Sequence, residues 1–228
     1  MSESQMSTEA MEALTSAKLG DLKKKINAAS WNPHMENLMK SWGEKSAGLR
    51  FMHSNASGYW KGFSNSLTLA SIAITTLASG ASLIAASIDD EAAKNIVLYA
   101  VGGIGIIAST LQSIKKFYNG EEKSAEHGAM AKQFGSFYRY MTLQMTLARE
   151  DRLPSDQLAE YALKEFERMQ QDALPLGGKQ IALYKKTFVN SKQATPDVCE
   201  DSFNIKIYDR IEEAASRDDL DVRSATSD

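Results

Sequence analysis

The chain has 228 residues, enough for one medium-sized domain or two small ones. Its formal net charge of −3 gives no electrostatic case for nucleic acid as a partner. The single cysteine, Cys199, excludes an intramolecular disulfide and a metal cluster built on thiolates. The mean hydropathy of −0.34 is ordinary for a soluble protein, but the apolar residues are unevenly distributed, and a middle third almost free of charge lies between two charged thirds.

Residues 1–62 predict amphipathic helices ahead of the apolar third. The first 14 residues are polar and acidic, without the basic and apolar stretches of a cleaved secretory signal, so membrane targeting is expected from an internal segment. Asn32 before Pro33 offers an N-cap and a proline at the first helical position. The helix that begins there can continue without a break into the apolar segment. The apolar residues at helical spacing are Met11, Leu14, Leu22 and Ile26, then Met35, Leu38, Met39, Trp42, Leu49, Met52 and Ala56.

Two uncharged runs, residues 63–88 and 95–114, predict a transmembrane hairpin over residues 63–114. As helices the runs would cover roughly 39 Å and roughly 30 Å, against a hydrocarbon core of about 30 Å. Every backbone polar group must be satisfied inside a bilayer, which favours two antiparallel helices joined by the short acidic connection between the runs. The alternative is a buried hairpin in a soluble bundle, because the runs are rich in Ala, Ser and Gly rather than Leu.

Basic and aromatic residues flank the outer ends of both runs. The predicted interfacial anchors are Trp60, Lys61, Lys115, Lys116, Phe117 and Tyr118. Lysine near a span marks its cytoplasmic end, and Trp and Tyr favour the membrane interface. Both polar termini are therefore expected on the cytoplasmic side, with the acidic connection on the opposite side.

Small and hydroxyl residues recur along one face of each run. The predicted helix-packing or pore-lining residues are Ser71, Thr75, Ser79 and Ser82 in the first run, and Gly102, Gly105, Ser109 and Ser113 in the second. Such residues let helices approach closely, within a hairpin or between copies. A polar pore in an oligomer is the sharper alternative, although no acidic or basic residue lies inside either run to mark an ion path.

The region 115–190 predicts further helices on the cytoplasmic side. A helix over residues 122–148 is expected to pack on the helix that precedes the first run. A second helix opens near Pro154, and a weaker one covers residues 179–189. The residues expected to be buried are Met130, Phe134, Phe137, Tyr138, Met141 and Met145, then Leu158, Tyr161, Ala162, Phe166 and Met169. The tail, residues 191–228, is acidic, and the alternation of Phe203, Ile205 and Ile207 indicates a short strand or docking segment.

The sequence contains little that indicates chemistry. His34, His53 and His127 follow no metal-ligand spacing, although His53 and His127 each lie about ten residues from a membrane border and can come close. A structural pair, or hydrogen bonds to carboxylates such as Glu122, is favoured over a metal site. Residues 103–108 match the pattern GxGxxA but lack the strand and the acidic residue of a dinucleotide site. No catalytic residue, cofactor or metal is expected, and the chain is predicted not to be an enzyme.

The residues around the two runs carry a resemblance to known proteins. They are Trp42, Lys45, Arg50 and His53 before the first run, and Phe117, Glu121, Glu122, His127, Phe137, Tyr138, Arg139 and the stretch 165–169 after the second. Across residues 42–190 the chain resembles two-span membrane proteins of nucleocytoplasmic large DNA viruses, whose organisation is similar to the SLATT-type two-transmembrane domains of bacteria and eukaryotes. These families have no established catalytic residues to carry over.

The resemblance implies two functions. The viral group implies a structural protein of an internal virion membrane that contacts the capsid, and the SLATT-type domains imply an oligomeric pore-forming effector. This chain has no fused sensor or nucleotidyltransferase-like domain, which weakens the second. We therefore expect a non-enzymatic two-pass protein of a virion or host internal membrane. Its partners would be the lipid bilayer, further copies of itself or neighbouring virion proteins, and a soluble helical adaptor is the remaining alternative.

Overall fold

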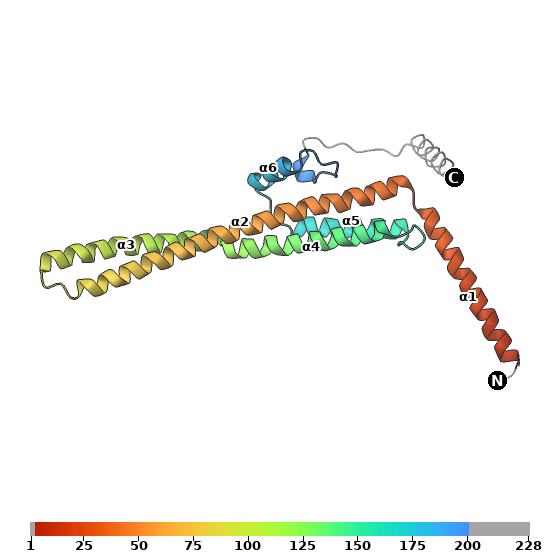
Figure 1. The fold of residues 1–228 in the computed structure, drawn as a ribbon, viewed down its shortest axis with the longest axis horizontal. Helices are drawn as coiled ribbons and strands as arrows, with labels where there is room; N and C mark the ends of the chain where they lie inside the picture. Colours follow the sequence, from red (N-terminus) through yellow and green to blue (C-terminus); the bar gives the residue numbers. More distant parts are fainter. Residues whose placement is uncertain (1–2, 201–228) are drawn as a thin grey trace. The chain divides into compact units, whose positions relative to one another are not determined.

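The computed structural model describes residues 3–200, with side chains from residue 14 onwards (Figure 1). Over this range the chain is all-helical and has no strand, which confirms the all-α prediction. The elements are α1 (Glu3–Ser30), α2 (Pro33–Ala85), α3 (Glu91–Tyr118), α4 (Gly120–Thr146), α5 (Ser155–Asp172), α6 (Gly178–Thr187) and the 3-10 turn η1 (Asp197–Cys199). The alternating segment Phe203, Ile205 and Ile207 lies outside the described residues.

The chain forms two compact units. Of the described residues, the first unit contains 3–49, 133–172 and 185–200. The second unit contains residues 50–132 and 173–184. Helices α2 and α4 therefore contribute to both units. The predicted boundaries at residues 62 and 114 fall inside α2 and α3.

The predicted start of α2 is confirmed. Pro33 is its first residue, and the side-chain oxygen of Asn32 accepts a hydrogen bond from the backbone N–H of Met35 at 2.8 Å. That bond satisfies one of the four N–H groups that a helix start leaves without a helical partner. From this cap α2 runs for 53 residues, so the polar helix continues into the apolar run, as predicted.

Apolar side chains of α2, α4 and α5 form the core of the first unit. The ring of Phe166 lies 6.3 Å from that of Phe134 and 5.8 Å from that of Phe137, centroid to centroid. Tyr161 is an exception to the predicted burial, because 42% of it is exposed and its ring packs at the edge of Tyr140. The buried apolar residues of this core are Met39, Phe134, Phe137, Met141, Leu158, Ala162, Phe166 and Met169.

Polar contacts connect the elements around this core. Glu36 in the first turn of α2 receives hydrogen bonds from both Arg149 and Arg152. The indole N–H of Trp31 donates to the carbonyl of Leu153 at 3.0 Å. Helix α1 contacts α5, yet its predicted apolar stripe is largely exposed. The exposed members of that stripe are Leu14, Leu22 and Ile26, together with Leu19.

Helix α3, in the second unit, has a well-defined start and end. The Asp90 side chain caps its first turn by accepting from the N–H of Ala92 at 3.2 Å, and Lys115 and Lys116 occupy its last turn. An acidic start and a basic end both suit the helix dipole. Asn119, with a φ of 45°, then connects α3 to α4 in the left-handed conformation that asparagine tolerates well.

Two helical segments are long and apolar enough to cross a membrane. They are Pro33–Ala85 and Glu91–Thr146, and their most apolar 18-residue windows are 0% and 6% buried within the chain. The described part of the chain thus leaves its most apolar stretches uncovered. Large exposed side chains there are Leu69, Ile72, Leu77, Leu83, Ile84, Ile96, Ile106 and Ile107.

Candidate functional site: a polar seam and its hollow

A polar seam joins α2 to the start of α4 within the second unit. We define it by four contacts: His53 with His127, Ser57 with Ser124, Trp60 with Lys123, and Ser64 with Glu121. On α2 these residues recur every three or four positions and so share one face. As the α2 residue number rises, the number of its partner on α4 falls, as expected where two helices run antiparallel.

The histidine pair occupies one end of the seam. The two Nδ1 atoms lie 2.9 Å apart, and only 1% of His53 and 4% of His127 is exposed. One neutral ring donates its N–H to the lone pair of the other. Burial and the neighbouring His127 lower the pKa of His53 to about 4, and burial lowers the pKa of His127 although Glu126 opposes the shift. Both rings are therefore neutral near pH 7.

The predicted approach of His53 and His127 is confirmed, and the alternative partner Glu122 bonds Asn119 instead. Among the described residues, no group of three or more His, Cys, Asp or Glu side chains could hold a metal ion. The pair is a hydrogen-bonded contact between two helices.

Reciprocal hydrogen bonds form the next contact of the seam. The Ser57 hydroxyl donates to the Ser124 carbonyl at 2.8 Å, and the Ser124 hydroxyl donates to the Ser57 carbonyl at 2.9 Å. Gly128 adds to this close approach, because a Cβ at its position would lie 3.3 Å from the Ser57 hydroxyl. Small side chains and shared hydroxyls are the means by which helices pack closely near a membrane.

Aromatic and basic residues surround the seam near the point where the first apolar run begins and the second ends. The Lys123 ammonium lies 4.5 Å from the centre of the Trp60 ring, and the Tyr118 and Phe63 rings are 5.5 Å apart. Of the predicted anchors, Trp60 and Tyr118 belong to this cluster, whereas 82% of Phe117 is exposed. Lys61 and Lys116 are also exposed. Phe63 and Lys123 were not among the predicted anchors, although both lie beside them in the sequence.

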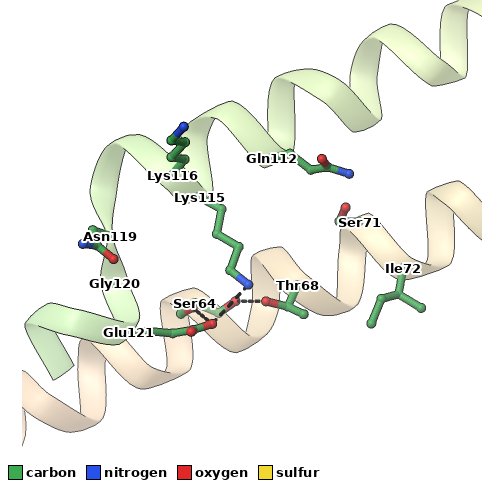
Figure 2. A pocket seen from close by; sticks show the side chains of 10 residues that line it. All are labelled: Ser64, Thr68, Ser71, Ile72, Gln112, Lys115, Lys116, Asn119, Gly120 and Glu121. Atoms are coloured by element: carbon green, nitrogen blue, oxygen red, sulfur yellow. Dashed lines mark hydrogen bonds and ion pairs between the residues drawn. The ribbon is translucent and has the colours of Figure 1, made fainter. Parts of the chain in front are cut away.

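A polar hollow of about 440 Å³ opens at the other end of the seam. The Lys115 ammonium lies 3.1 Å from a Glu121 carboxylate oxygen, which also accepts from the Ser64 hydroxyl at 3.2 Å. Figure 2 shows Lys115 reaching from α3 toward both residues. These two contacts lower the pKa of the Glu121 carboxyl. The hollow is lined by Ser64, Thr68, Ser71, Ile72, Gln112, Lys115, Lys116, Asn119, Gly120 and Glu121.

The predicted packing or pore face is only partly covered within the chain. Ser71 and Gly105 are half-buried, and Ser71 lines the hollow. Thr75, Ser79, Ser82, Gly102, Ser109 and Ser113 are exposed. The hydroxyls of Thr75 and Ser109, for example, donate to the carbonyls four residues earlier in their own helices at 2.8 and 2.9 Å. Hydroxyls satisfied in this way can face lipid or another copy without a further partner.

A different set of side chains forms the less exposed face of the apolar segments. On α2 these are Leu67, Ile74, Ala78, Ala81 and Ala85, and on α3 they are Val97, Val101, Ile104, Ala108 and Leu111. Leu67 and Ile74 are seven residues apart with half-buried Ser71 between them, and the other intervals are three or four, as in a helix that packs along a neighbour. Hydroxyl and glycine spacing places Ser71 and Gly105 on these faces but does not predict the alanine and branched side chains around them.

Comparisons with protein-family models, curated proteins and solved structures find no match to this chain. The described residues define an all-helical protein with two helices able to cross a membrane. The resemblance to viral two-span proteins and SLATT-type domains remains a prediction.

Proposed function

We propose that the chain is an integral membrane protein anchored by a helical hairpin over residues 63–114. The observation that carries this proposal is the exposure of the two apolar windows, of which 0% and 6% is buried. Soluble monomers rarely leave apolar patches larger than a few hundred Å² in water, and larger ones mark contact with a membrane or another protein. Lipid can cover the apolar runs of both helices.

The distribution of charge supports a topology with both polar termini on the cytoplasmic side. Lys61, Lys115 and Lys116 lie at one end of the apolar runs, whereas Asp89 and Asp90 lie in the connection at the other. Lysine-rich flanks are retained on the cytoplasmic side, so the acidic connection would face the opposite compartment.

The role that we propose is structural and non-enzymatic: the hairpin anchors the protein and the first unit binds neighbouring proteins. The exposed leucine and isoleucine side chains of α1 support such docking, because they are apolar and uncovered. The resemblance to viral two-span proteins suggests a virion or host internal membrane as the setting, and capsid or neighbouring virion proteins as partners. Purified particles that lack this protein would refute the virion setting.

Extraction and labelling test the anchor and its topology. The protein should stay in the pellet after alkaline carbonate extraction, whereas a soluble helical adaptor would be released. With Cys199 replaced by serine, Ser87→Cys in the loop between α2 and α3 should resist a membrane-impermeant maleimide added to the cytoplasmic side. Ser54→Cys, which is exposed on α2 before the first run, should react. Equal labelling of both variants would contradict the topology.

An oligomeric pore is the second candidate, and the exposed hydroxyls of both apolar helices favour it. Thr75, Ser79 and Ser109 are uncovered within one chain, so several copies could turn them toward a common axis. Purified protein in liposomes should then leak ions, and Thr75→Leu or Ser79→Leu should reduce the leak. Leu77→Ile, an apolar exchange on the same helix, is the control. Absence of flux from inserted oligomers would remove this candidate.

A further inference from the structure

We propose that the hollow beside the seam binds one anionic phospholipid through its phosphate and ester groups. This inference rests on the membrane anchor proposed above and concerns a different property, the choice of lipid. It begins from three polar side chains that line the hollow: Ser71, Gln112 and Lys116. Within the described residues, none of these three side chains has a hydrogen-bonding or ionic partner.

The hollow exists because small residues line it. Ser64, Thr68 and Ser71 lie on one turn after another of α2, and Gly120 lies opposite. A Cβ on Gly120 would lie 3.2 Å from the Trp60 carbonyl oxygen, so the two helices approach each other closely there. Beyond this close contact the short side chains leave space between α2 and α3.

The charge in the hollow suits a single negative group. Lys115 and Lys116 supply two positive charges and Glu121 one negative charge, which leaves one positive charge in excess. Lys115 is paired with Glu121, whereas the Lys116 ammonium lies away from that carboxylate (Figure 2). A phosphate at the rim would accept hydrogen bonds from the Lys116 ammonium. It would also interact with the Lys115 ammonium, which Glu121 already contacts. Basic pockets between membrane helices bind anionic headgroups in this way.

The order of groups along the hollow matches the order along a phospholipid. Lys115 and Lys116 lie at the border of the apolar run, where a phosphate would be. Gln112 is about one turn further in, and it points toward Ser71 from the other helix (Figure 2). The Gln112 amide and the Ser71 hydroxyl could donate hydrogen bonds to the ester carbonyls of the lipid, which lie deeper in a bilayer than the phosphate.

Apolar side chains continue the site toward the acyl chains. Ile72 lines the hollow and is 58% exposed, and Leu69 on the same helix is 70% exposed. A free phosphate ion would use only the lysines at the rim. A phospholipid would also use the deeper donors and this apolar surface, and for that reason we favour it.

Native mass spectrometry of the full chain in detergent tests the site with equimolar phosphatidylglycerol and phosphatidylcholine. The wild type should retain phosphatidylglycerol in preference to phosphatidylcholine. Lys116→Gln should reduce that preference roughly fivefold, because one lysine near an anionic headgroup contributes about that factor. Lys94→Gln, at the opposite end of α3, should leave it unchanged. Glu121→Gln should increase the preference, because it releases Lys115 from its carboxylate partner.

The outcomes separate this inference from the membrane anchor. Equal retention of the two lipids by a carbonate-resistant wild type would overturn the lipid site and leave the anchor intact. Displacement of phosphatidylglycerol by inorganic phosphate would identify a site for a soluble anion and overturn the phospholipid assignment. Release of the protein by carbonate would refute the anchor itself. Gln112→Leu should weaken retention of phosphatidylglycerol without changing charge, and unchanged retention would contradict the role of the deeper donors.

Discussion

His53 and His127 illustrate how burial governs a polar contact between two helices. Their Nδ1 atoms are 2.9 Å apart, so at least one ring must be neutral for the hydrogen bond to form. The pKa of His53 is lowered to about 4, and that of His127 is lowered as well. In the unfolded chain each histidine titrates near pH 6.5. The unfolded state therefore binds more protons than the folded state between pH 6.5 and 4.

The histidine pair makes the folded state less stable as the pH falls. Because the folded pKa is lowered, the stabilising contribution is complete above pH 6.5 and is lost as the pH falls toward 4. The shift of His53 corresponds to a loss on the order of 3 kcal/mol across that range. Thermal unfolding in detergent at a series of pH values would measure it.

Two histidine variants test whether this pair causes the pH dependence of stability. His53→Gln should flatten the pH dependence, since it removes the group whose pKa is lowered to about 4 while leaving an amide able to bond His127. His34→Gln, a histidine outside the seam, should retain the dependence of the wild type. An identical slope in all three proteins would contradict the assignment to the pair.

At the scale of helices, the close approach of α2 and α4 depends on a few glycines. Gly120 and Gly128 both lie within α4, which remains helical through them. A Cβ on Gly120 would meet the Trp60 carbonyl at 3.2 Å and the Ser64 Cβ at 3.3 Å. By contrast, a Cβ on Gly58 would meet nothing within 4 Å.

Replacement by alanine should change the free energy of unfolding in opposite directions at Gly120 and at Gly58. Gly120→Ala should lower the free energy of unfolding by about 1 kcal/mol, because the helices must separate to admit the methyl group. Gly58→Ala should raise it by roughly 0.5–1 kcal/mol, because alanine favours the helix and meets no obstacle. Thermal or denaturant unfolding in detergent would compare them. Stabilisation by both substitutions would show that α2 and α4 are further apart than the seam requires.

For the whole molecule, the decisive feature is the uncovered apolar surface. Leu77 lies in the middle of the first apolar run and 69% of it is exposed. If lipid covers this surface, a charge at that position must enter hydrocarbon. If another protein subunit covers it in solution, the same charge would disturb association instead.

A lysine at two exposed leucines distinguishes these cases. Leu77→Lys should disfavour insertion by about 3 kcal/mol and reduce the carbonate-resistant fraction. Leu143→Lys, at a leucine that is 57% exposed on α4 outside the apolar runs, should leave that fraction unchanged. A carbonate-resistant fraction unchanged in Leu77→Lys would weigh against the first run as a span.

The sequence by itself determined the features that depend on neighbouring residues along the chain. The Asn32–Pro33 helix start and the continuous helix through residues 33–85 follow from capping chemistry and from long runs without charge. The approach of His53 and His127 also followed, because both lie at similar distances from the apolar runs. The helix start and the continuous helix need only local propensity, whereas the histidine contact also needs the two runs to pair as a hairpin.

Only the tertiary structure decided which face of each helix is covered. One residue turns a helix by about 100°, so a small error in phase moves a side chain from a covered face to an exposed one. Thr75 and Ser79 are exposed for this reason, whereas Ala78 between them is half-buried. The contact of Ser64 with Glu121 likewise joins residues that no local pattern connects. The seam arises from the packing of α2 on α4 and the hollow from the space that α3 leaves beside them, and packing depends on the shapes of all three helices.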